Sequence, residues 1–262
     1  MANMHKPASG HEKIETSNFL MIVLILLAVA VGGIVEIVPL FFQRSTTQPV
    51  EGLKPYTPLQ LAGRDIYVRE GCYNCHSQMI RTLLPDVIRY SRAGHNDDYS
   101  HLGESIYDHP FQWGSKRTGP DLHRVGGKYP SLWHVRHMDR PDSTTPGSVM
   151  PRYPHLQKDP IDASRVGSKM RALRSVGTPY TDGEIESAPA AIAAQAKLIA
   201  AEVEAQQGPA GLADREITAL TAYLQRLGTD IKWKRVAPQA PLAPAPPAAP
   251  VPAADPAAIA EK

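Results

Sequence analysis

Hydrophobic positions are unevenly spread along this chain. An almost unbroken apolar run covers residues 19–42, with Glu36 as its one charged residue. At about 1.5 Å per residue, the run is long enough to cross a hydrocarbon core of ~30 Å. A cleaved signal peptide is the alternative, but its apolar stretch usually spans only about 7–15 residues, and no small-residue cleavage site follows Phe42. The pattern therefore predicts one uncleaved transmembrane helix.

Amphipathic helices are predicted beyond this run. Thr57 begins the first with a capping box and a proline start, and Gly71 is expected to end it. The second lies within residues 212–228 and carries an apolar stripe of Ile217, Leu220, Leu224 and Leu227. The alanine-rich segment 187–206 is expected to add a helix on the surface. Because no strand-like alternation competes with these patterns, we predict an all-α fold.

The predicted organisation of the chain is an N-terminal segment at 1–18, an anchor at 19–42, a connector at 43–56, one folded domain at 57–236 and a Pro/Ala-rich tail at 237–262. The tail is expected to have no packed core. The formal net charge of +2 does not indicate nucleic acid, and no such partner is expected. Balanced lysine and arginine residues around the anchor leave its orientation open. Glu36, near the second end of the span, can reach interfacial water, and it is also a candidate functional carboxylate.

The candidate chemistry lies in residues 71–76, G-C-Y-N-C-H, which contain both cysteines of the chain. A redox-active dithiol, half of a zinc site and a covalently attached haem all use this spacing. A thioredoxin-like dithiol belongs to a strand-helix-strand frame, and a structural zinc site needs four ligands, whereas the chain has no second cysteine pair. Haem attachment uses all three residues, Cys72 and Cys75 for the vinyl groups and His76 for the iron. The motif therefore favours a c-type haem.

A methionine is the usual second axial ligand when a c-type haem transfers electrons at high potential. The candidates after the motif are Met79, Met138, Met150 and Met170. Met150 is favoured because Pro146, Pro151 and Pro154 stiffen its loop, and a weak thioether ligand benefits from being held in place. A histidine or another methionine is the alternative.

These motifs resemble the cytochrome c family. The segment from residue 63 to His76 is similar to the first helix of that family running into the haem motif, and residues 216–228 are similar to its last helix. The resemblance implies that the two helices cross at Gly63, Tyr67, Ala222 and Tyr223. It also implies that the carbonyl of Pro120, within T-G-P-D-L, accepts the N–H of His76. The loop between His76 and Gly119 is much longer than is usual in the family.

The sequence of this long loop limits the resemblance to one subfamily of cytochromes c. Residues 107–129, Y-D-H-P-F-Q-W-G-S-K-R-T-G-P-D-L-H-R-V-G-G-K-Y, together with G-C-Y-N-C-H-S-Q-M-I-R and M-P-R-Y-P, resemble the mono-haem cytochrome c subunit, subunit II, of cbb3-type cytochrome c oxidases. The likeness runs from the anchor to about Trp233. Residues 94–101, residues 187–206 and the tail depart from it.

The resemblance implies one covalent haem c and a single-pass protein of the bacterial inner membrane, with residues 1–18 in the cytoplasm and the haem domain in the periplasm. Electrons are then expected to come from a di-haem cytochrome c subunit. They would leave for the haem b of the catalytic haem-copper subunit, which reduces oxygen to water. The chain is expected to carry electrons within this oxidoreductase complex and to lack the oxygen-reducing centre. A freestanding membrane-anchored electron shuttle is the alternative.

A basic cluster lies close to the resembling segment and comprises Lys116, Arg117, Arg124, Lys128, Arg136 and Arg140. Such a cluster can satisfy haem propionates, and Trp113 and Arg117 are the residues first expected in the haem environment. A solvated or interfacial face is an equally good interpretation. Arg81, His109 and Trp113 are candidates for contact with the catalytic subunit.

Overall fold

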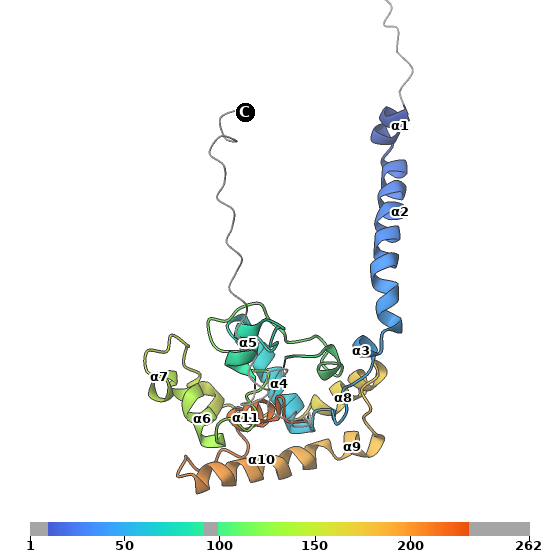
Figure 1. The fold of residues 1–262 in the computed structure, drawn as a ribbon. Coiled ribbons are helices and arrows are strands. Elements are labelled where there is room, and N and C mark those ends of the chain that lie inside the picture. The colour runs from blue at the N-terminus through green and yellow to red at the C-terminus, as the bar shows by residue number, and fades with distance from the viewer. Residues whose placement is uncertain (1–9, 92–98, 231–262) are drawn as a thin grey trace, which may run out of the picture.

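The structure is a computed structural model that describes residues 10–91 and 99–230. Within these ranges the chain forms helices and 3-10 turns and no named strand, which confirms the all-α prediction (Figure 1). The predicted tail, and the end of the folded domain after residue 230, lie outside the described residues. The elements are α1 (Gly10–Thr16), α2 (Asn18–Ile37), η1 (Val38–Phe42), α3 (Arg44–Thr47), α4 (Pro58–Arg69), η2 (Cys72–Asn74), α5 (Leu84–Tyr90), η3 (Leu102–Glu104), α6 (Ser131–Asp139), α7 (Pro141–Thr144), η4 (Pro154–Gln157), α8 (Val166–Ser175), α9 (Asp182–Glu186), α10 (Ala188–Ala205) and α11 (Glu216–Arg226).

The predicted anchor forms α2 and continues through η1 as one apolar rod that stands away from the rest of the molecule (Figure 1). Residues 18–42 are long and apolar enough to cross a membrane, and none of them is buried inside the protein. The α-helix gives way to a 3-10 turn around Pro39, because proline lacks the N–H that an α-helix needs at this position. The helix is consistent with a membrane anchor.

The connector between anchor and domain is hydrogen-bonded to the domain at Val50, Lys54 and Tyr56, with the carbonyl of Tyr56 accepting from the hydroxyl of Tyr180 at 2.8 Å. The N–H of Val50 donates to the carbonyl of Gly103, at 3.2 Å. Further along, the N–H of Lys54 donates to Asp230 Oδ2 at 2.8 Å, and the guanidinium of Arg226 donates to the carbonyl of Lys54 at 2.6 Å. The segment that leads from the membrane span to the folded domain is therefore part of the domain surface.

Helices α4 and α11 cross at the centre of the domain. Thr57 and Gln60 form the predicted capping box of α4. Gly63 is required at the crossing, because a Cβ there would lie 1.9 Å from the carbonyl oxygen of Ala219 on α11. The rings of Tyr67 and Tyr223, both fully buried, have centroids 5.4 Å apart.

The crossing differs in one residue from the arrangement that the resemblance implies. Ala219, and not Ala222, is the small residue nearest to Gly63. The physical reason is helix geometry, because Ala219 and Tyr223 are four residues apart and share one face of α11. Ala222 is itself buried, one position away from that face.

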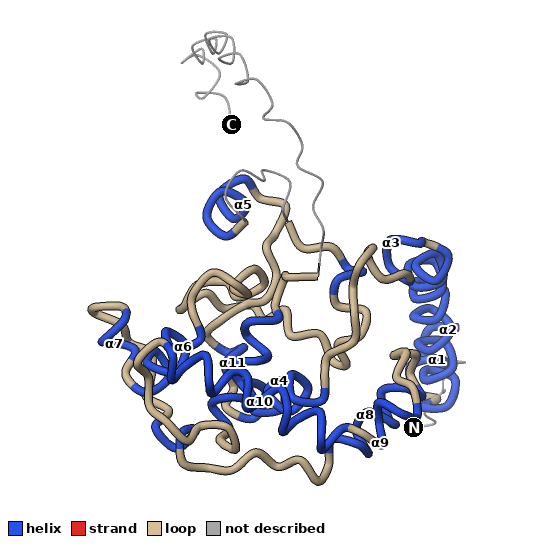
Figure 2. The backbone as a smooth tube through the Cα atoms, turned by 90° about the horizontal axis from the view of Figure 1, so that it is seen from below, coloured by secondary structure: helices blue, strands red, loops and turns tan. Residues whose placement is uncertain are grey.

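Helix α10 is more than the surface addition that its alanine-rich sequence suggests. One face of it is buried, with Ala188, Ile192, Ala196, Ala200 and Val203 following helical spacing. This face packs on α4, α6, α8 and α11. In Figure 1, α10 runs along the bottom of the domain while α2 rises above it, and Figure 2, seen from below, shows α10 beside α4 and α11. The small alanines allow close approach, so α10 completes the core.

Candidate haem site

The two cysteines and the histidine share one turn directly after α4. Gly71 adopts a left-handed conformation, with φ of 69°, and ends the helix as predicted. The N–H groups of Cys75 and His76 then both donate to the carbonyl of Cys72, at 3.1 and 2.9 Å. This η2 turn projects three chemically active side chains from six consecutive residues.

The ring of His76 is held in one tautomer. Its Nδ1 lies 2.8 Å from the carbonyl oxygen of Pro120, which is the hydrogen bond that the resemblance implies. Because a carbonyl can only accept, Nδ1 carries the proton and Nε2 keeps the lone pair that a metal requires. Burial lowers the pKa of His76, although the Pro120 carbonyl and the charge of Asp121 act in the opposite direction. The ring is therefore neutral at pH 7 and competent to bind iron.

A second segment runs beside the motif and fixes its position. The N–H of Gly119 donates to the carbonyl of Cys75 at 3.0 Å, and the N–H of Gln78 donates to the carbonyl of Trp113 at 2.8 Å. Gly119 lies against the imidazole of His76, where a Cβ would approach Cε1 to 2.2 Å. Only glycine fits at position 119 without moving the ring.

Asp121 joins the two segments through its side chain, a role that the sequence did not reveal. Its Oδ2 accepts hydrogen bonds from the hydroxyl of Ser77 at 2.6 Å and from the N–H of Met79 at 2.8 Å. Its Oδ1 accepts the N–H of His123 at 2.8 Å. Because Asp121 directly follows Pro120, this carboxylate also positions the carbonyl that holds His76. Asp121 lies in the T-G-P-D-L motif seen in the sequence. Its partners could not be predicted, because they come from a different part of the chain.

The thiols fit covalent haem attachment better than redox chemistry. Cys72 is half-buried, Cys75 is exposed, and both are free. Burial and the charge of Glu70 raise the pKa of Cys72 to about 12, whereas redox-active dithiols depend on a lowered thiol pKa. Across residues 10–91 and 99–230, no group of three or more His, Cys, Asp or Glu side chains is placed to hold a metal ion. Two free thiols, an oriented imidazole and the space left by Gly119 together match the needs of a c-type haem.

Arg117 is the member of the basic cluster that lies against the motif. It pairs with His76 in an isolated β-bridge, and its Nη2 donates to the carbonyl of Met79 at 2.7 Å and to Asp86 at 2.8 Å. Its Nε is buried and has no hydrogen-bond partner in the described part of the chain. An added anionic group, such as a haem propionate, would satisfy this donor.

Other predicted members of the haem environment have protein partners. The indole N–H of Trp113 donates to the hydroxyl of Ser105 at 3.3 Å. Arg124 is buried and paired with Glu104 at 2.7 Å. Arg140 is exposed and paired with Asp142 at 3.0 Å. Arg117, Arg124 and Arg140 of the basic cluster are therefore each engaged in a separate ion pair.

A family model described as the mono-haem subunit of cytochrome c oxidase, FixO, matches residues 11–231. The chain belongs to this family. It is accordingly a mono-haem subunit of a cbb3-type cytochrome c oxidase, an oxidoreductase complex in which other oxidase subunits are its partners. A direct comparison with curated proteins finds no match.

The methionines of this FixO family member differ in their surroundings. Met170 on α8 is fully buried, and Met138 on α6 is 8% exposed, so both fill the helical core. Met150 is partly buried and packs against the edge of that core, with its N–H donating to the hydroxyl of Ser148 at 3.3 Å. Met79 is also partly buried, on the segment that follows the motif. Of the four candidates after the motif, Met150 and Met79 are thus the two not enclosed by core packing.

His137 on α6 is a histidine that the sequence did not single out. Its Nδ1 lies 2.5 Å from the hydroxyl of Thr144, and its ring stacks on Trp133 at a centroid distance of 4.4 Å. Burial lowers the pKa of His137, and the charge of His76 lowers it further. His137 is the histidine that we test beside Met150 for the second axial position.

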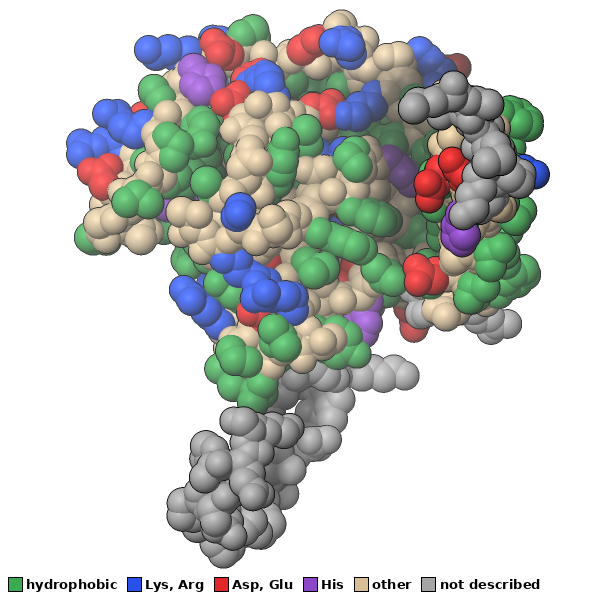
Figure 3. Space-filling model, turned by 90° about the horizontal axis from the view of Figure 1, so that it is seen from above, with side chains coloured by type: hydrophobic (Ala, Val, Ile, Leu, Met, Phe, Trp, Pro, Cys, Tyr) green, Lys and Arg blue, Asp and Glu red, His purple; other side chains and the backbone are tan. Residues whose placement is uncertain are grey.

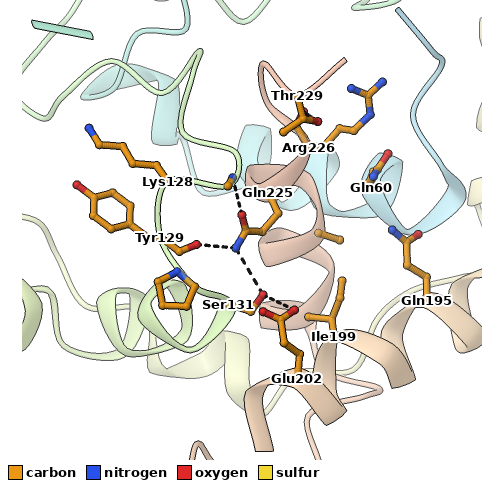
Figure 4. A pocket seen from close by; sticks show the side chains of 13 residues that line it. Gln60, Lys128, Tyr129, Ser131, Gln195, Ile199, Glu202, Gln225, Arg226 and Thr229 are labelled. Atoms are coloured by element: carbon orange, nitrogen blue, oxygen red, sulfur yellow. Dashed lines mark hydrogen bonds between the residues drawn. The ribbon is translucent and has the colours of Figure 1, made fainter. Parts of the chain in front are cut away.

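A groove of about 570 Å³ lies elsewhere, between α10, α11 and the loop before α6 (Figure 4). Lys128 of the basic cluster lines it, but none of Cys72, Cys75, His76, Trp113, Arg117, Pro120 and Met150 does. The side chain of Gln225 accepts the N–H of Gly127 and donates to the carbonyl of Tyr129, while the hydroxyl of Ser131 donates to Glu202. Because these polar groups already have protein partners, we interpret the groove as part of the packing between helices and not as a ligand site.

Proposed function

We propose that this chain is the electron-transfer subunit of its oxidase and carries one covalent haem c. Cys72 and Cys75 form the thioether bonds, each thiol adding across one vinyl group. His76 and Met150 are the axial ligands of the iron. Trp113 and Arg117 belong to the haem environment. Bound haem supplies a one-electron ferric/ferrous couple, while the protein supplies ligands, burial and docking geometry.

The proposed path of the electron runs from the di-haem cytochrome c subunit, through this chain, to the haem b of the catalytic haem-copper subunit. That subunit reduces oxygen to water, and this chain has no oxygen-reducing centre. The haem domain lies on the periplasmic side of the bacterial inner membrane, where c-type haem is attached. Membership of the FixO family and the anchor-like helix α2 support this proposal.

The chain's own residues have a specific task in this proposal. Pro120 holds Nδ1 of His76, and the missing Cβ of Gly119 leaves room for the ring. In this orientation Nε2 would offer its lone pair to the haem iron. Asp121 stabilises the segment that carries both. The protein thereby fixes one axial ligand before electron transfer, which limits the rearrangement needed when the iron changes charge.

The observation that carries the proposal is the single turn holding Cys72, Cys75 and His76, with the imidazole already oriented by Pro120. Pyridine haemochrome spectra of the purified chain should give one haem per polypeptide, and the haem should stay bound in denaturing electrophoresis. Cys72→Ala and Cys75→Ala should each leave at most one thioether bond, and the double variant should lose the stain. A mass equal to the amino acids alone, from cells able to make c-type cytochromes, would contradict the proposal.

The second axial ligand has its own test. Met150→Ala should lower the reduction potential and allow the ferrous protein to bind carbon monoxide, while Met79→Leu, a change at the other thioether outside the core, should not. His137→Leu should keep the six-coordinate spectrum. If instead His137→Leu opens the sixth position and Met150→Ala does not, the histidine is the ligand and the assignment of Met150 is wrong.

The place in the complex is tested by blue-native electrophoresis after mild detergent extraction. Migration together with haem b and copper supports the oxidase subunit. Migration near the mass of the chain alone supports a freestanding shuttle and contradicts the proposed path.

A further inference from the structure

Helix α5 exposes a set of large aliphatic side chains beside the haem site. We call Leu83, Leu84 and Ile88 the α5 patch; their exposed fractions are 54%, 66% and 69%. The opposite side of the helix is buried through Asp86 and Val87. Isolated apolar residues are common on protein surfaces. Here Leu84 and Ile88 are four residues apart and share one face of α5, and Leu83 directly precedes the helix.

The α5 patch is rigidly connected to the segment that carries His76. Asp86 Oδ2 accepts a hydrogen bond from Arg81 Nε at 2.8 Å and lies 2.8 Å from Arg117 Nη2. Arg117 in turn pairs with His76 in the β-bridge. One buried carboxylate therefore links the exposed helix to the backbone of the proposed iron ligand.

Helix α5 lies on the side of the domain from which α2 rises (Figure 1). In Figure 1, α5 lies at the top of the domain, at the level of the C-terminal end of α2, while α10 lies at the bottom. Figure 3 looks onto this upper face and shows hydrophobic side chains gathered over α5, with Lys and Arg side chains next to them. The apolar surface thus lies where a domain suspended from α2 meets the membrane-embedded part of its complex.

We propose that the α5 patch docks onto an apolar surface of a membrane-embedded subunit of the same oxidase. This inference rests on the proposed function and adds the surface through which the haem domain is held. A fixed contact at α5 would set the position of the His76 segment relative to the acceptor through Arg117 and Asp86.

A lipid bilayer is the other occupant to consider, and the composition of α5 argues against it. Helices that lie in the membrane interface have a polar face rich in lysine and arginine, whereas α5 carries one arginine, Arg89, and one aspartate, Asp86. Arg89 lies over the ring of Tyr90, 5.2 Å from its centroid. Seven residues offer little area for insertion, and α2 already provides an anchor-like span. An apolar protein surface matches a small and rigid patch better.

The first experiment uses the intact oxidase with Leu84→Asp and Ile88→Asp, singly and together. Leu198→Asp is the matched control, because Leu198 is 72% exposed on α10, away from the α5 patch. Haem content and the reduction potential of the isolated chain should stay unchanged in all variants. The double variant should reduce electron transfer from the haem of this chain to haem b, or its co-purification with the other subunits, at least tenfold. The control should match the wild type.

The outcomes separate this inference from the proposed function. If the wild-type chain reduces haem b and the double variant behaves like Leu198→Asp, the docking proposal is overturned and the proposed function stands. If the wild-type chain itself neither co-purifies with nor reduces haem b, the proposed function has failed first, and the docking proposal fails with it.

A second measurement distinguishes protein from lipid. Hydroxyl-radical footprinting reports the accessibility of Leu84 and Ile88 side chains in the full haem-loaded chain, first alone in phosphatidylcholine nanodiscs and then in the intact oxidase. Protection that appears only in the oxidase, with Leu198 reactive in both samples, supports the proposal. Protection already present in nanodiscs identifies the bilayer as the occupant, and reactivity in both samples shows that nothing covers α5; either result overturns the proposal.

Discussion

The α4–α11 crossing and the haem segment, by which we mean residues 71–79 and 117–121, are stabilised by different kinds of contact, although they meet at Tyr67. The crossing is a contact between two regular helices, filled by side chains such as Tyr223 that are fully buried. The haem segment has no long element of its own. It is held by backbone carbonyls, by Asp121 and by the hydroxyl of Tyr67, which donates to the carbonyl of His76 at 3.3 Å.

This difference separates stability from function. Apolar burial is non-directional and can be achieved by many sequences, whereas the orientation of His76 depends on a few directional hydrogen bonds and on one missing Cβ. Damage to the crossing should therefore unfold the domain, and damage to the haem segment should alter the haem while the helices persist.

The largest effect should come from closing the space at the crossing. Gly63→Ala places a Cβ against the carbonyl of Ala219, so we expect a loss of about 3 kcal/mol or more in the free energy of unfolding. Urea titration of the detergent-solubilised chain measures it. Gly183→Ala on α9 is the control, because a Cβ there meets nothing within 4 Å and should leave stability unchanged or slightly higher. Equal behaviour of the two variants would show that the helices do not approach closely.

Low pH should first reduce the stability of the loop region that contains Glu104. Burial raises the pKa of Glu104, but hydrogen bonds and charges from His123 and Arg124 outweigh it and lower the pKa to about 2. A carboxyl with a depressed folded pKa stabilises the protein above its unfolded pKa of 4.5 and loses this effect as the pH falls towards 2, a change of about 3 kcal/mol. The free energy of unfolding measured from pH 6 to 2 should show this slope, and Glu104→Gln should flatten it.

Closing the space beside His76 should affect the haem more than the fold. Gly119→Ala brings a Cβ to 2.2 Å from Cε1 of the imidazole, so the ring must move away from Pro120. We expect at least about a twofold loss of haem per polypeptide in haemochrome spectra, with about 1–3 kcal/mol of destabilisation. Gly167→Ala on α8, where a Cβ would make only ordinary contact at 3.7 Å, should keep full haem content. Normal haem content in Gly119→Ala would contradict the proposed fit.

The smallest effect should come from the cap of α4, which lies away from the haem motif and whose Thr57 hydroxyl also donates to Oε1 of Gln195 on α10 at 2.7 Å. Thr57→Ala removes the acceptor for the N–H of Gln60 and should cost about 1 kcal/mol. Thr181→Ala, which removes the equivalent cap of the shorter and more exposed α9, should cost less. Both variants should keep the haem spectrum of the wild type, and a spectral change in Thr57→Ala would mean that α4 transmits strain into the motif.

The sequence predicted the parts of the fold that follow local rules. The start of α4 at Thr57, its end at Gly71 and the stripe on α11 follow from capping chemistry and periodicity. Helix α10 was predicted as a helix, but its buried face was not, because alanine has a high helix propensity and carries little information about burial. Helices α5, α6 and α8 were not predicted.

The candidate site was predicted through its motif and not through its geometry. The C-x-x-C-H spacing identified Cys72, Cys75 and His76, and the resemblance to cytochrome c identified Pro120. Gly119 and Asp121 act through contacts with His76, Ser77 and Met79, more than 40 residues away in the sequence, so no local pattern could assign their partners. The identity of the second axial ligand stays a prediction.

The attachment of residues 43–56 to the domain has a consequence for the range of this electron carrier. Hydrogen bonds at Val50 and Lys54 leave little slack between membrane span and haem domain. A haem domain attached so closely to its membrane span cannot move between widely separated redox partners. It is suited to electron transfer between partners held at fixed positions. A longer connector would make the transfer depend on diffusion of the domain.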